Sequence, residues 1–198
     1  MNLLAQMSNL QLEQQRHDDI AHRDILALTA QNRVKHMVLH FAKYSGHFAD
    51  VQETRDEARF TATLVDTFII CLACANALNF RLGELLKDAD LSSVNLTSVT
   101  GGRAIDLAIP FFPQFAKITG TMAKACESLD HFEKFDYHGT LERGLIAITL
   151  LCLDIAQKAK IDLGVLTRAR WATIERKFLS SSDVVSKNES IRLAASKK

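Results

Sequence analysis

FAKYSGHFADVQETRD (residues 41–56) and FAKITGTMAKACESLD (residues 115–130) align without a gap and share seven of sixteen residues. A second pair follows in the same order: LVDTFIICLACANALNFRLGEL (64–85) and LIAITLLCLDIAQKAKIDLGVL (145–166), which also share seven residues. Two matched segments in a fixed order are typical of an internal repeat. The sequence therefore predicts a duplicated two-helix unit.

The chain has only two prolines and eight glycines, and its apolar residues recur with a period of about 3.6, which predicts an all-α protein. Helices are expected near residues 10–28, 31–55, 58–79, 103–109, 112–133, 139–160 and 163–179. We expect a helical arm (1–30), repeat 1 (31–91), a linker (92–102), repeat 2 (103–179) and a mobile tail (180–198). The two repeats are expected to form one compact domain.

The two helices of each unit differ in their apolar pattern. The second helix (64–79 or 145–160) is apolar on almost every side, as expected for a helix at the centre of a bundle. Two such hairpins predict a four-helix-bundle core with an approximate internal two-fold axis. Gly46 and Gly120 occupy matching positions in the first helix and cost about 1 kcal/mol each relative to alanine. We expect them to permit a close approach of helices.

Composition limits the possible partners. A formal net charge of +1 favours neither nucleic acid nor an acidic membrane surface, so neither is expected as a partner. The N-terminus lacks the features of a signal peptide, and the longest apolar stretch, residues 68–78, is too short to span a bilayer. Cys71 and Cys74 are interpreted as small buried apolar side chains, which suits a cytoplasmic protein.

Residues 66–86 (DTFIICLACANALNFRLGELL) and 160–166 (KIDLGVL) resemble a segment of the all-α nucleoside triphosphate pyrophosphohydrolases, the MazG-like group that includes the dimeric dUTPases. That family carries E-E-x-G-E on one helix, E-x-x-D on the next, and then an apolar run ending L-A-x-x-L-G-I-D-L-E-E-A-L. Gly46 and Gly120 match the glycine of the first motif. The resemblance implies a helical bundle whose carboxylates hold Mg²⁺ ions that bind a triphosphate.

The acids of these motifs are nearly all replaced. They fall on Lys43, Tyr44, His47, Thr63 and Asp66 in copy one, and on Lys117, Ile118, Thr121, Gly144 and Ala147 in copy two. Hard divalent ions need several oxygen ligands, and only Asp66 remains. The leading hypothesis is therefore a degenerate, non-catalytic member of the superfamily. Lys43, His47 and Lys117 would bind a nucleotide or another anionic small molecule.

Two alternatives remain open. The chain could be an active Mg²⁺-dependent nucleoside triphosphate pyrophosphatase whose metal is held by Asp66 with relocated acids, Glu53, Asp56 or Glu57. It could instead be a helical interaction module whose apolar surfaces form a homodimer. The active enzyme would release pyrophosphate from nucleoside triphosphates, whereas the size of the protein in solution would test the homodimer.

A histidine pattern also bears on metal binding. His36 and His40 have the i, i+4 spacing that can bind a transition metal, and His47 continues the same stripe. Only Asp66 or Asp50 could complete such a site, and a solvent-facing stripe is the expected alternative. His17-Asp18 has no matching upstream histidine, so a phosphohydrolase of the His-Asp type is not predicted.

Overall fold

The computed structural model describes residues 3–87 and 111–195, and every regular element within those two ranges is an α-helix. The helices are α1 (Leu3–Ala21), α2 (Arg23–Leu26), α3 (Ala30–Thr54), α4 (Glu57–Ala77), α5 (Leu82–Leu85), α6 (Phe111–Asp130), α7 (Tyr137–Lys158) and α8 (Leu163–Ala195). The predicted all-α class is confirmed. The linker at 92–102 and the helix expected at 103–109 lie outside the described residues.

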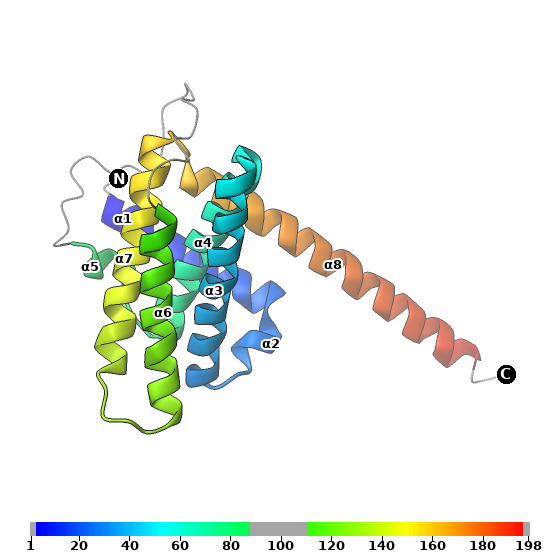
Figure 1. Ribbon diagram of the computed structural model, residues 1–198. Helices are drawn as coiled ribbons and strands as arrows, with labels where there is room; N and C mark the ends of the chain where they lie inside the picture. Colours follow the sequence, from blue (N-terminus) through cyan, green and yellow to red (C-terminus); the bar gives the residue numbers. More distant parts are fainter. Residues whose placement is uncertain (1–2, 88–110, 196–198) are drawn as a thin grey trace.

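Two antiparallel hairpins, α3–α4 and α6–α7, form the core of the protein (Figure 1). Contacts of α3 with α6 and of α4 with α7 join them into a helical bundle. The hairpin turns are capped by aspartates: the side chain of Asp56 accepts from the backbone N–H of Arg59, and that of Asp136 accepts from Gly139. An N-cap aspartate satisfies an orphan donor and fixes where each second helix begins.

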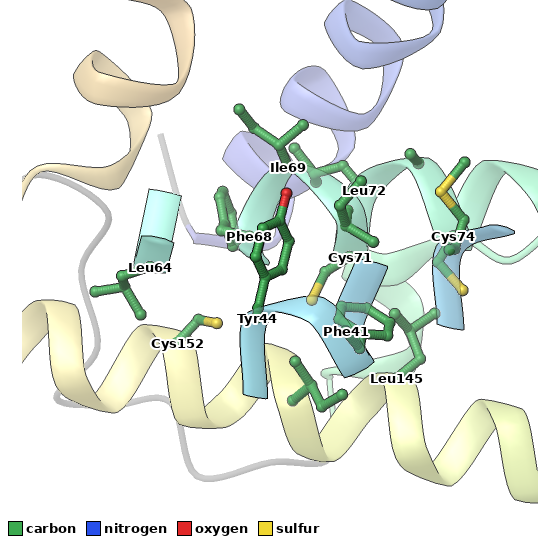
Figure 2. Packing of buried hydrophobic residues seen from close by; sticks show 14 of the residues in the cluster. Phe41, Tyr44, Leu64, Phe68, Ile69, Cys71, Leu72, Cys74, Leu145 and Cys152 are labelled. Carbon is green, nitrogen blue, oxygen red and sulfur yellow. The ribbon is translucent and has the colours of Figure 1, made fainter. Parts of the chain in front are cut away.

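α4 is the most buried helix of the bundle. Thirteen of its residues are buried, and twelve of them form an almost continuous run from Thr63 to Ala75 (Figure 2). By length and hydropathy it is the one helix of the described residues that could also cross a membrane, although the 68–78 stretch had appeared too short. However, 67% of that window is buried inside the protein. The core helix of a bundle has the same pattern.

Several residues matched by the sequence repeat contact each other across the bundle. The rings of Phe41 and Phe115 meet edge to face, with centroids 6.3 Å apart. Cys71 and Cys152 are neighbours, and their thiols lie between α4 and α7 (Figure 2). The adjacent Cys71 thiol and burial raise the pKa of Cys152. The four cysteines are buried free thiols, in agreement with the apolar role predicted for Cys71 and Cys74.

The second helices of the two hairpins end in the same way. Asn79 and Lys160, matched in the sequence alignment, both adopt a positive φ (57° and 55°) just after α4 and α7. The N–H of the next residue then bonds back to Ala75 or Ala156, which closes a Schellman motif. Neither position is a glycine, so this turn could not be recognised from glycine punctuation.

The outer helices differ most from expectation. The N-terminal helix was expected at 10–28, but α1 begins at Leu3 and ends at Ala21, and a short α2 follows. α1 packs on α4, α5 and α8. α8 was expected to end at 179 but runs to Ala195 and projects away from the bundle (Figure 1). The chain has no glycine or proline between residues 165 and 195, so no residue type that breaks a helix interrupts it.

The expectation for Gly46 and Gly120 is wrong. Both are exposed, and a Cβ built at either position would meet nothing within 4 Å, so no helix approaches closely there. The close approaches occur at other glycines. A Cβ at Gly83 would lie 2.7 Å from the carbonyl oxygen of Leu4, and one at Gly144 would lie 2.5 Å from the side chain of Met122.

Gly46→Ala and Gly120→Ala should each stabilise the protein by about 1 kcal/mol, because alanine is the better helix former and fits the open space. The measurement is the urea unfolding midpoint. Gly83→Ala is the matched control: its Cβ would meet the backbone of α1, so it should lower the midpoint instead. A loss of stability in Gly46→Ala would contradict the open environment.

Candidate functional site

Asp66, the acid that the sequence resemblance singled out, is held by an arginine from α8. Arg170 donates to both carboxylate oxygens, with Nε 2.8 Å from Oδ1 and Nη2 3.1 Å from Oδ2. This bidentate pair gives the carboxylate a fixed cationic partner. The hydrogen bond to Asp66 raises the pKa of Arg170.

Three of the predicted residues gather around Tyr44 of α3. The Nζ atom of Lys43 lies 4.5 Å from the centroid of the Tyr44 ring, in cation–π geometry, and the ring of His47 lies 5.8 Å from it. Burial, and then the charge of Asp66, raise the pKa of Tyr44, whereas Arg170 opposes that rise. Lys43, His47 and Asp66 therefore share one neighbourhood.

The other predicted residues lie elsewhere. Glu53 and Asp56 are exposed at the α3–α4 turn, where Asp56 is the N-cap. Asp56 is separated from Asp66 by ten residues of α4, a rise of about 15 Å, so they cannot ligate one ion. Asp50 forms an ion pair with Arg59 at 2.6 Å. Lys117 is exposed on α6, in the other hairpin.

A pocket of about 90 Å³ opens one to three turns along α4 from Asp66, between α4, α3 and the α1–α2 segment. Its polar lining includes Gln14, Asp18, His22, Arg33, His36, His40 and Asn76, and Ile69, Ile70 and Ala73 of α4 form its apolar wall. A single water needs about 10–15 Å³ by this measure, so the pocket has room for several waters or a small ligand.

The predicted pair His36 and His40 faces this pocket rather than forming a solvent stripe. Their Nε2 atoms are 3.1 Å apart, and the Nδ1 atom of His40 is 3.1 Å from Nζ of Lys43. Burial first, and then the charge of Lys43, lower the pKa of His40 to about 4. A neutral imidazole keeps a lone pair that can accept a proton or bind a metal.

The sequence reasoning missed a second cluster, formed by His17, Asp18 and His22. One potential ligand atom from each lies within 4.8 Å of the others. Burial raises the pKa of Asp18 to about 7, and it lowers the pKa of His22. The available signal was the His-Asp-x-x-x-His spacing at 17–22 together with the His36/His40 pair. The missing fact was that α1 lies against α4 beside α3.

The site thus has two parts: a cationic neighbourhood around Tyr44 and a histidine-lined pocket next to it. No protein-family model, curated protein or solved structure matches this chain. The chemistry of the two parts is therefore the basis for assigning a function.

Proposed function

We propose that the chain is a catalytically degenerate relative of the MazG-like nucleoside triphosphate pyrophosphohydrolases that binds a nucleotide or another anionic small molecule in the cytoplasm. The proposed origin is a tandem duplication of a two-helix unit. It is supported by contacts between matched residues, Phe41 with Phe115 and Cys71 with Cys152, and by the identical turns at Asn79 and Lys160. Matched residues are expected to meet when two copies pack about a two-fold axis.

The observation that carries the loss of catalysis is the Asp66–Arg170 pair. Magnesium prefers near-octahedral oxygen coordination and usually takes one or two carboxylates together with the phosphates of its substrate. The only acid at the family positions of this chain is already bound at 2.8 and 3.1 Å by a guanidinium. A second cation, the Nζ atom of Lys43, lies 4.5 Å from the centroid of the Tyr44 ring and would repel a metal ion bound nearby.

The same cations support binding of an anion. Lys43 is exposed, His47 is half-buried beside it, and Arg170 completes the cationic side of Tyr44. Phosphate oxygens are the natural partners of lysine and arginine donors. Lys117 occupies the corresponding position in the second hairpin, so a second, independent contact point is part of the proposal.

Nucleoside triphosphates should bind in the presence of EDTA, and Lys43→Glu should weaken that binding by about tenfold or more, because one attraction becomes a repulsion. The readout is quenching of Trp171, the only tryptophan, which adjoins Arg170. Lys134→Glu, at an exposed residue of the α6–α7 turn, is the charge-matched control and should bind as the wild type does. Absence of binding at millimolar nucleotide would contradict the proposal.

Pyrophosphate release separates this proposal from the active enzyme. We expect no release with Mg²⁺ or Mn²⁺ above that of Asp66→Asn, tested on ribo- and deoxyribonucleoside triphosphates. Metal-dependent turnover that disappears in Asp66→Asn would mean that the chain is an enzyme with relocated ligands. The proposed loss of catalysis would then be wrong, independently of the result of the nucleotide-binding assay.

A further inference from the structure

We propose that His17, Asp18 and His22 form a binding site for a divalent first-row transition-metal ion, such as Zn²⁺, beside the pocket between α1 and α4. Their potential ligand atoms lie within 4.8 Å of one another. Two imidazoles and one carboxylate suit such ions rather than Mg²⁺, which prefers oxygen ligands alone. This site shares no residue with the Asp66–Arg170 pair, so it stands or fails independently of the proposed function.

His17 is held in the orientation that a metal ligand requires. Its Nδ1 atom lies 2.7 Å from Oε1 of Glu175, and because a carboxylate can only accept, Nδ1 is the donor. The side chain is 2% exposed, and its Nε2 atom has no hydrogen-bond partner among the described residues. A carboxylate behind the distal imidazole nitrogen is the usual support of a metal-bound histidine. A metal ion would satisfy the buried Nε2 atom.

The rings around His17 restrict its motion. It stacks on Trp171 of α8 with centroids 5.9 Å apart and an interplanar angle of 27°. The ring of His22 meets it edge-on at 5.3 Å. His22 occupies the break between α1 and α2, where its φ of −134° departs from helical geometry. The break that separates the two helices therefore also brings the second imidazole of the site to the first.

Asp18 supplies the carboxylate. It is 8% exposed, and Gln14 donates from Nε2 to Oδ1 at 2.7 Å, which leaves Oδ2 available to bind an ion. Ligand atoms around a tetrahedral Zn²⁺ lie roughly 3.3 Å apart, as follows from bond lengths of about 2.0–2.1 Å. Small side-chain rotations would therefore close the three atoms onto one ion.

The remaining coordination position would open toward the pocket. Asp18 and His22 both contribute to its lining, as do the further imidazoles of His36 and His40. Arg33 is the cation of the same lining, and its buried Nε atom has no partner among the described residues. An open position facing an arginine suits water or a small anion bound to the metal. The site is thus of the kind that can accept an exogenous ligand.

Calorimetric titration of the full chain with ZnCl₂, after treatment with EDTA and its removal, tests the proposal. We expect one ion per chain, with affinity lowered at least about tenfold in Asp18→Asn and in His22→Ala. Glu175→Gln, which alters only the residue that positions His17, should lower it by about ten- to hundredfold and shift the visible absorption of bound Co²⁺. Imidazole ¹⁵N shifts of the wild type should change at His17 and His22 on addition of Zn²⁺.

Two matched variants serve as controls. Asp19→Asn removes the neighbouring exposed carboxylate, and His131→Ala removes an exposed histidine of the α6–α7 turn; both should bind Zn²⁺ as the wild type does. Three results would overturn the site: no binding below millimolar Zn²⁺, equal affinity in Asp18→Asn and Asp19→Asn, or loss of binding in His36→Ala with retention in His22→Ala. The nitrogen shifts are measured on the wild type, so they decide the question even if a variant fails to fold.

Discussion

Phe115→Ala should lower the free energy of unfolding by about 3–5 kcal/mol, the usual cost of emptying a buried phenylalanine site. Phe115 is fully buried where the two hairpins meet. Its ring contacts those of Phe41, Phe48 and Phe111, with centroids 6.3, 5.3 and 5.6 Å away. Aromatic rings held on several sides cannot collapse into the space left by a lost neighbour. Urea denaturation followed by far-ultraviolet circular dichroism measures the change.

The control is the same substitution at the opposite extreme of burial. Phe132, in the α6–α7 turn, is 94% exposed, so Phe132→Ala should change stability by no more than about 0.5 kcal/mol. The two variants remove the same atoms, and their difference isolates the packing at the junction of the hairpins. If Phe115→Ala were as stable as Phe132→Ala, the described packing of α6 against α3 at Phe115 would be contradicted.

Gln14→Leu should destabilise the protein by about 2–4 kcal/mol although leucine matches glutamine in size. Gln14 is 1% exposed and links two helices: its Oε1 accepts from Nε1 of Trp171 at 2.9 Å, and its Nε2 donates to Asp18. Leucine would leave both partners buried and unpaired, at about 1–3 kcal/mol each. Thermal unfolding monitored by circular dichroism would report the loss.

Two further variants divide this effect. Trp171→Phe removes the indole N–H together with three heavy atoms of a buried ring, so it should destabilise the protein through both the lost hydrogen bond and looser packing. Gln15→Leu changes the adjacent residue, which donates a long 3.4 Å hydrogen bond to the exposed Asp19, and should be nearly neutral. Equal stability of Gln14→Leu and Gln15→Leu would show that the buried glutamine does not connect α1 to α8.

The four core helices could be predicted from the sequence because their signals are local. α3, α4, α6 and α7 begin within about two residues of the expected positions. Asp56 and Asp136 mark two of the starts. The outer helices were less predictable: α1 begins at Leu3 and ends at Ala21, whereas the helix was expected at 10–28. α8 continues through a polar segment that lacks a stop signal.

The site was less predictable than the fold because its contacts are long-range. Asp66 was identified from its place in a motif, but its partner Arg170 lies 104 residues away and no periodicity relates them. Similarly, His36 and His40 were noticed as an i, i+4 pair, whereas His17 lies in α1 and His22 in the break after it, in a segment that was predicted only as an N-terminal arm. Tertiary packing, which a single sequence does not encode locally, brings these groups together.

The partners of α1 also determine when the site can form during synthesis. The hydrogen-bond partner of Gln14 is Trp171, which is translated 157 residues later, and the partner of His17 is Glu175, which is translated 158 residues later. At about 5–20 residues per second, these partners emerge roughly 8–30 s after α1 itself. The α3–α4 hairpin needs only neighbouring residues and can pair long before then. α1 is therefore translated first but is among the last helices to gain its packing partners. A nascent chain interrupted before α8 would contain the histidines of the pocket without Trp171 and Glu175, which orient Gln14 and His17.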